Sequence, residues 1–239
     1  MTLRIACLGD SLTRAQFSVD YLEPLRRRHP PGDAQLARFG VNGDFAYNLL
    51  QRLDAVVANP PDVITVLIGT NDARASVAGH PVEQVMKRKR LPQRPSAGWF
   101  QECLGAVVTR LRAETDATLG LLSLPVLGQQ LDGAAAQASQ AYSRMIAEVA
   151  DTNKVAYLPL HERQIEDLRR ADAPPIPYRE ATPAAVAGVL LQRAVLRRSL
   201  DAISQRRGLV LTTDHVHQNS RGAAHIAEVI DAGLLARVT

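Results

Sequence analysis

Residues that could form a serine nucleophile and its base lie near the two ends of the chain. Ser11 follows the apolar run at 3–8 and a glycine, a pattern typical of a buried strand that runs into a tight turn. A serine hydroxyl is a weak nucleophile and needs a base within hydrogen-bond reach. Asp214 and His217 lie three residues apart before a helical pattern. This spacing lets the Asp214 carboxylate meet the His217 ring and select its tautomer, so that His217 can take the proton of Ser11 and later return it to the leaving group.

Other residues compete for these two roles. Cys7 is the rival nucleophile, although a thiol within an apolar strand more often serves packing. His215 is the rival base, but its ring is expected to project away from the neighbouring Asp214. The remaining histidines fall on predicted helices or loops with no paired carboxylate, and we interpret them as surface or packing residues: His29, His80, His161 and His225.

Donors for an oxyanion follow two further predicted strands. A tetrahedral intermediate needs hydrogen-bond donors aimed at its negative oxygen. The candidates are the backbone N–H groups of Ser11 and Gly43, since glycine allows close backbone approach, and the side-chain amide of Asn71. Taken singly, Gly43 is equally explained as a turn glycine and Asn71 as a cap. Open parallel sheets, however, place their sites outside the carboxyl ends of their strands, so these three positions are expected to converge.

The elements that must position these groups alternate along the chain. Apolar or β-branched runs predict strands at about 3–8, 34–39, 62–68, 118–124 and 155–158. Apolar residues at helical spacing predict helices at about 16–29, 45–57, 98–115, 134–152, 160–171 and 220–236, and 73–98 is expected to be irregular. Strands that alternate with helices imply a parallel sheet with right-handed crossovers, and therefore an α/β fold with three layers, an α/β/α sandwich.

Four short blocks give the chain a resemblance to the SGNH (GDSL) hydrolase family of serine esterases and lipases. They occur in the family's order and are Gly9-Asp10-Ser11-Leu12, Gly43-Asp44, Gly69-Thr70-Asn71-Asp72 and Asp214-His215-Val216-His217. The first block alone is a weak match, but the four together are specific. The resemblance covers 1–72 and 208–236 well, and 115–160 in outline.

Carried over position by position, the resemblance implies a role for each of five residues. Ser11 is the implied nucleophile, His217 its base and Asp214 the acid that orients the base. Gly43 and Asn71 complete the oxyanion hole with the Ser11 N–H. The implied fold is flavodoxin-like, with strand order 2-1-3-4-5. The implied reaction is hydrolysis of an ester through an acyl-enzyme, with neither a metal nor an organic cofactor.

Length and composition are those of one globular domain over 1–239. Two cysteines argue against a disulfide framework, and a net charge of +4 specifies no partner. The chain has no run of roughly 20 apolar residues, as a transmembrane helix needs, and no signal-peptide pattern, so we expect a cytoplasmic protein. The basic run at 87–90 has no interleaved aromatic residues, which favours a solvated loop over a nucleic-acid site.

One segment, 160–208, is long for the compact members of the family and lies directly before the Asp214 block. Its prolines predict an extended stretch at 173–178, and Thr182-Pro183 predicts the start of a long helix over 183–206. We favour a lid that shapes the substrate pocket, which could also include 73–98. The 183–206 helix could instead form a homodimer, or lie on an anionic lipid surface.

The sequence favours a hydrolase of small-molecule carboxylic esters. The candidate substrates are short-chain acyl or acetyl esters and lysophospholipids, among which the residues do not choose. An acyltransferase is an alternative, because the same triad serves both reactions and only a dry pocket distinguishes them. A non-catalytic binding protein on the same fold predicts the loss of at least one catalytic position, and every one is present.

Overall fold

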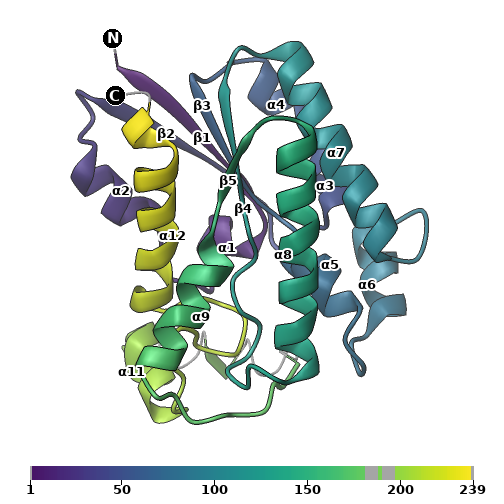
Figure 1. The fold of residues 1–239 in the computed structure, drawn as a ribbon, viewed down its shortest axis with the longest axis vertical. Coiled ribbons are helices and arrows are strands. Elements are labelled where there is room, and N and C mark those ends of the chain that lie inside the picture. The colour runs from purple at the N-terminus through teal and green to yellow at the C-terminus, as the bar shows by residue number, and fades with distance from the viewer. Residues whose placement is uncertain (1, 181–187, 190–196, 238–239) are drawn as a thin grey trace.

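The computed structural model describes residues 2–180, 188–189 and 197–237. A sheet of five parallel strands, in the order β2-β1-β3-β4-β5, forms its centre (Figure 1). The strands are β1 (Leu3–Gly9), β2 (Ala34–Gly40), β3 (Val63–Leu67), β4 (Thr118–Leu122) and β5 (Ala156–Leu158). This order confirms the predicted flavodoxin-like fold, and every predicted strand is present.

Alternation along β1 shows why the sheet is covered on both faces. Ile5 and Cys7 pack in the core formed with α2 (Leu22–Arg28) and α12 (Ser220–Gly233). Ala6 and Leu8 point to the opposite face and pack in a larger core. That core includes side chains of α3 (Ala46–Leu50), α7 (Ala97–Glu114) and α8 (Ala134–Thr152). A strand buried on both faces needs apolar residues at nearly every position, which is what made the sheet recognisable in the sequence.

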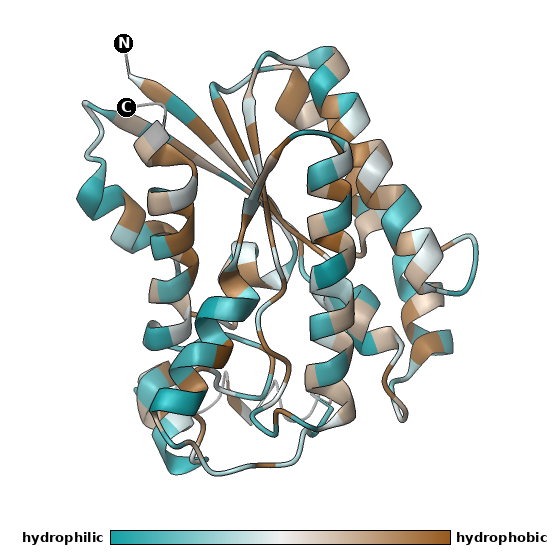
Figure 2. Ribbon diagram, in the orientation of Figure 1, coloured by the Kyte–Doolittle hydropathy of each residue, from teal (hydrophilic) through white to brown (hydrophobic). Residues whose placement is uncertain are grey.

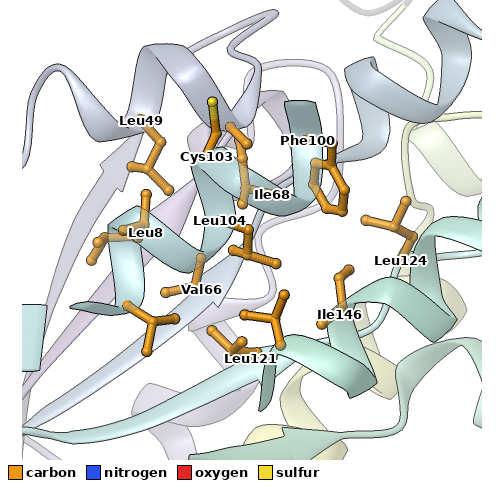
Figure 3. Close-up of a cluster of buried hydrophobic side chains, with 14 of the residues drawn as sticks. Leu8, Leu49, Val66, Ile68, Phe100, Cys103, Leu104, Leu121, Leu124 and Ile146 are labelled. Atoms are coloured by element: carbon orange, nitrogen blue, oxygen red, sulfur yellow. The ribbon is translucent and has the colours of Figure 1, made fainter. Parts of the chain in front are cut away.

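Aromatic and aliphatic side chains of α7 and α8 fill the larger core (Figure 3). Phe100 and Leu104 of α7 and Ile146 of α8 lie over Val66 and Leu121 of the central strands. The strands and the helix faces turned toward them are hydrophobic, whereas the outward faces of the helices are hydrophilic (Figure 2). The two cores hold the sheet rigidly, and thereby set the positions of the loops that follow its strands.

The remaining helices are short. They are α1 (Ser11–Arg14), α4 (Asp54–Val57), α5 (Thr70–Ala75), α6 (Val82–Lys89), α9 (Leu160–Arg170), α11 (Leu200–Arg206) and the 3₁₀ turn η1 (Leu235–Arg237). Among the described residues, no helix combines the length and the apolar character needed to cross a membrane.

Two helices predicted in the first third of the chain are shorter than expected. The stretch 16–29 is helical only in α2. The stretch 45–57 is divided into α3 and α4 by a tight turn, in which the Arg52 N–H donates to the Leu49 carbonyl at 3.1 Å. A turn closed by such an i→i−3 bond keeps the apolar residues on one face, so the periodicity alone did not reveal the break.

The stretch 73–98 is not irregular, because it contains the end of α5 and all of α6. The basic run 87–90 is the last turn of α6 and not a loop, with Arg90 in a left-handed cap at φ +52°. Basic side chains are favourable at a helix C-terminus, where the backbone dipole is negative. The run therefore has a local structural explanation.

The long helix predicted at 183–206 is interrupted. Residues 197–199 are not helical: Arg197 has a φ of +49°, and Ser199 is extended and accepts a hydrogen bond from the Ala202 N–H at 3.1 Å. Ser199 thus caps a new helix, α11. Half of the predicted helix lies outside the described residues, and the homodimer that the helix could form stays a prediction.

Candidate active site

Ser11 begins α1 directly after β1, and the two residues before it explain the sharp turn. A Cβ atom at Gly9 would lie 2.4 Å from the Leu67 carbonyl oxygen, so the close approach of β3 requires glycine. The Asp10 carboxylate accepts a hydrogen bond from the Leu12 N–H at 2.9 Å and caps α1. The turn holds the Ser11 side chain at the carboxyl end of a central strand, where only 7 % of its surface is exposed.

A tight loop before α12 holds Asp214 and His217 in a defined relation. The Thr213 N–H donates to the His217 carbonyl at 2.8 Å and closes the loop. One carboxylate oxygen of Asp214 accepts from the backbone N–H groups of His217 (2.8 Å) and Val216 (3.2 Å). The loop thereby fixes the Asp214 side chain and leaves its second oxygen available to the His217 ring.

The three side chains form one hydrogen-bonded chain. His217 Nδ1 lies 2.8 Å from Asp214 Oδ2, and His217 Nε2 lies 3.2 Å from Ser11 Oγ. Because an ionised carboxylate only accepts hydrogen bonds, Nδ1 carries the proton and Nε2 presents a lone pair to the Ser11 hydroxyl. The structure thus brings together three of the residues singled out in the sequence, in an arrangement that can remove the hydroxyl proton.

The charge on Asp214 is maintained by its neighbours although the carboxyl is buried. Burial alone would raise its pKa, but the facing His217 ring and the backbone N–H groups lower the pKa below its usual range. The Phe17 ring packs beside the His217 ring, with the two centroids 5.4 Å apart. The group opposite the base is therefore an anion at neutral pH.

The other two predicted residues, Gly43 and Asn71, lie at the ends of the neighbouring strands. Gly43 has a φ of +73°, a conformation that favours glycine, in the loop after β2. The Asn71 side-chain amide donates to the Asp44 carbonyl at 2.9 Å and lies 3.4 Å from Asp10 Oδ2. Asn71 therefore links the loop that holds Gly43 to the turn that holds Ser11.

Two basic residues that the sequence analysis did not assign to the site anchor this loop through Asp44. Lys89 Nζ donates to the Asp44 carboxylate and to the Asn42 carbonyl, both at 2.7 Å. Arg52 donates to the same carboxylate at 2.8 Å and to the Gly9 carbonyl at 2.9 Å. The basic run contained Lys89, but only tertiary structure reveals that one of its members faces inward.

Neither rival residue competes in the structure. Burial raises the pKa of the Cys7 thiol to about 11, and its side chain lies in the core. His215 has a φ of +72°, and its ring packs 5.9 Å from Tyr178, centroid to centroid. Burial also lowers the pKa of His215. The base that reaches Ser11 is His217.

The expectation that the other histidines lack carboxylate partners is wrong for three of them. His29 lies 2.6 Å from Asp231, His80 lies 3.3 Å from Glu180 and His225 lies 3.4 Å from Asp167. Each partner comes from a distant part of the chain, so no local pattern could show it. His161 instead lies 3.2 Å from the Leu124 carbonyl oxygen.

Residues 173–180, called the proline segment below, form neither a helix nor a strand and pack beside the site. The Gln129 side-chain amide donates to the carbonyl of Pro174 (2.9 Å) and to that of Gly208 (3.0 Å). A Cβ atom at Gly128 would lie 3.2 Å from the Cβ of Tyr178. The proline segment is thus tied to the loop after β4.

A cavity of about 470 Å³ lies between the proline segment and the loop of Asp214. Its lining residues are Ile176, Pro177, Arg179, Glu180, Arg207, Asp214 and His215. The described part of the 160–208 segment therefore borders the candidate site. Within the described residues, no group of three or more His, Cys, Asp or Glu side chains is arranged to hold a metal ion.

Comparison with solved structures shows the same fold. Axe2, an acetylxylan esterase from Geobacillus stearothermophilus, is 15 % identical with a TM-score of 0.67, over 97 % of this chain and 93 % of that one. The acetyl xylan esterase AlAXEase is 19 % identical with a TM-score of 0.71, over 97 % of this chain and 100 % of that one. LAE5, an alpha/beta hydrolase enzyme from the metagenome of Lake Arreo, Spain, is 16 % identical with a TM-score of 0.66, over 97 % of this chain and 94 % of that one.

No curated protein matches the chain in sequence. The family comparison, in contrast, covers nearly the whole chain, because residues 7–224 match the GDSL-like Lipase/Acylhydrolase family. The matched range includes Ser11, Gly43, Asn71, Asp214 and His217. The chain therefore belongs to the GDSL-like lipase/acylhydrolase family and is a carboxylic ester hydrolase.

Proposed function

We propose that the protein hydrolyses its ester through an acyl-enzyme formed on Ser11. The supporting observation is the hydrogen-bonded chain from Asp214 through His217 to Ser11, with links of 2.8 and 3.2 Å. Ser11 Oγ attacks the carbonyl carbon and its proton passes to His217 Nε2, which then protonates the departing alcohol. Water attacks the acyl group and gives one proton to His217. The acid leaves, and the proton returns to Ser11 Oγ.

The oxyanion of both tetrahedral intermediates accepts hydrogen bonds from the backbone N–H groups of Ser11 and Gly43 and from the Asn71 amide. Support comes from the position of these groups at the ends of β1, β2 and β3, and from the 2.9 Å bond that holds the Asn71 amide on the loop of Gly43. Donors that are already oriented stabilise the charge without reorganisation.

The proposed substrate class rests on the fold neighbours. The fold neighbours include proteins described as acetylxylan esterases, which makes acetyl esters the first class to test. We propose a short acyl group. We also propose that residues 160–208 are an insertion in a single domain, and that the cavity beside the proline segment receives part of the substrate.

The nucleophile is tested by p-nitrophenyl acetate turnover and by labelling with a fluorophosphonate. Ser11→Ala is expected to abolish both turnover and labelling. Among the described residues, Ser11 carries the hydroxyl that is hydrogen-bonded to the His217 ring. Cys7→Ala is the matched control, since it removes the rival nucleophile, and it is expected to retain both signals. Activity in a folded Ser11→Ala variant would refute the mechanism.

The acyl preference is tested with p-nitrophenyl esters of increasing chain length, with lysophosphatidylcholine in parallel. The proposal predicts the highest kcat/KM for acetate or butyrate and little release of fatty acid from the lysophospholipid. A maximum at long chains would overturn the short-chain assignment while leaving Ser11 as nucleophile. Adding alcohol acceptors tests the acyltransferase alternative, because transfer of the acyl group to an alcohol gives a new ester in place of the free acid.

A further inference from the structure

A network of polar side chains connects the proline segment to the carboxamide of Asn71. Arg74, which follows Asn71 by three residues in α5, donates from Nη1 to Asn71 Oδ1 at 3.1 Å. The other terminal nitrogen of Arg74 forms an ion pair with Glu180. Tyr178 donates its hydroxyl to the second oxygen of Glu180 at 2.7 Å, and His80 Nδ1 lies 3.3 Å from the same oxygen.

Arg74 fixes the orientation of the Asn71 carboxamide, that is, which side its oxygen faces and which side its amino group faces. A guanidinium has only donors, so the atom that faces it must be the carboxamide oxygen. On the other side the Asp44 carbonyl is only an acceptor, so the amino group must face it. A reversed carboxamide would place donor against donor and acceptor against acceptor. Both contacts therefore hold the N–H groups of Asn71 on the side of Asp10, the residue before Ser11, and of Asp44, the residue after Gly43.

The guanidinium can stay at this position because a carboxylate neutralises it. The side chains of Arg74 and Glu180 are only 13 % and 19 % exposed, and an unpaired charge at such a depth is costly. Burial alone would raise the pKa of Glu180, but His80 and Arg74 beside it lower the pKa to about 2. Glu180 is therefore ionised at every pH at which a histidine base works.

We propose that Glu180 and Arg74 are positioning residues that orient Asn71 as an oxyanion donor, so that docking of the proline segment completes the oxyanion hole. The inference rests on the proposed function. An oxyanion exists only in the transition state and the intermediates, so an Asn71 carboxamide in the wrong orientation slows the chemical step and leaves substrate binding intact. The segment thus contributes to rate as well as to shape.

The kinetic test uses Glu180→Gln, which keeps the size of the side chain and an acceptor for Tyr178 but removes the charge. We expect kcat for p-nitrophenyl acetate to fall about 10-fold to 100-fold with KM unchanged, because a misoriented oxyanion donor should cost less than the roughly 10²- to 10³-fold loss that follows when a donor is removed. Because Glu180 is ionised throughout, the loss should be the same from pH 6 to pH 9. Glu228→Gln, which breaks the comparable ion pair with Arg163 on the surface, is the matched control and should keep full activity.

A double-mutant cycle shows whether Glu180 acts through Asn71. In an Asn71→Ala background, Glu180→Gln should not lower kcat any further, because the carboxamide that Glu180 orients is absent. Arg74→Lys should reproduce the effect of Glu180→Gln, since an ammonium cannot bridge Asn71 and Glu180 in the same way. An equal loss of kcat in the Asn71→Ala background, or a rise in KM alone, would overturn the proposal.

A measurement that needs no turnover separates this inference from the proposed function. In ¹⁵N NMR spectra the Asn71 side-chain amide, assigned by its disappearance in Asn71→Asp, should exchange slowly with solvent in the unmodified protein and rapidly in Glu180→Gln. Unchanged exchange would refute the positioning role even if the protein is an active esterase. An inactive protein that still shows the change would refute the proposed function alone.

Discussion

His215 and His217 are separated by one valine, yet their rings make different contacts in the structure. The ring of His217 spans Asp214 and Ser11, whereas the left-handed backbone of His215 turns its ring toward Tyr178. From the sequence we expect only that the His215 ring projects away from Asp214. The choice of base thus depends on backbone conformation, and not on which histidine stands closer to Asp214 in sequence.

This difference predicts opposite outcomes for the same substitution at the two positions. His217→Asn should lower kcat by about 10³-fold, because the Ser11 hydroxyl loses its base. His215→Asn is the matched control, since asparagine tolerates a positive φ, and it should change kcat by no more than a few-fold. Steady-state kinetics with p-nitrophenyl acetate measure both. An equal loss in the two variants would place His215 in the mechanism.

At the scale of elements, the turn from β3 into α5 shows how packing demands a glycine. Gly69 has a φ of +114°, and a Cβ atom there would lie 2.6 Å from the Phe100 ring. Gly79 also has a positive φ, +86°, but a Cβ atom at that position meets nothing within 4 Å. The two glycines therefore separate the cost of backbone strain from the cost of overpacking.

Gly69→Ala is expected to lower the free energy of unfolding by about 1–3 kcal/mol more than Gly79→Ala, the usual range for overpacking a core. Both variants place a side chain at a positive φ and so strain the backbone. Only Gly69→Ala also displaces the Phe100 ring, which packs against the start of α5. Urea unfolding followed by circular dichroism gives both values. Equal losses would show that the core around Phe100 relaxes freely.

Elements that are determined by local sequence patterns were predicted from the sequence. Elements that depend on tertiary contacts were not. The strands and α7, α8 and α12 carry periodic apolar residues, so they were predicted closely. The division at Arg52 leaves no trace in the periodicity, because the tight turn there keeps the apolar residues on one face. The partners of the Arg52 guanidinium, the Gly9 carbonyl and Asp44, are distant in sequence. The motif residues of the site could likewise be predicted, but Arg74 and Glu180 could not, since 106 residues separate them.

At the scale of the whole molecule, buried carboxyl groups near the site couple stability to pH. Burial raises the pKa of Asp10 to about 6 and that of Asp72 to about 7, against 3.8 in an exposed chain. Between pH 4 and pH 7 the folded protein therefore holds protons that the unfolded chain has already lost. The contribution of these groups to the free energy of unfolding falls as pH rises through that window.

Asp72→Asn should remove the larger share of this dependence while keeping an acceptor for the Ala46 N–H. Relative to the unmodified protein, the variant's free energy of unfolding should increase from pH 4 to pH 7 and level off above pH 7, where Asp72 is ionised in both states. Urea denaturation at each pH gives the difference. A difference that does not vary with pH would show that Asp72 is ionised in the folded protein across this range.

The bond between Ser11 and His217 joins residues that are 206 positions apart. Ser11 is therefore synthesised well before its base, and it has no base until the loop before α12 has been made. Non-local contacts of this kind form late in folding. The appearance of esterase activity during refolding should coincide with the docking of α12, which makes catalysis a reporter of the final folding step.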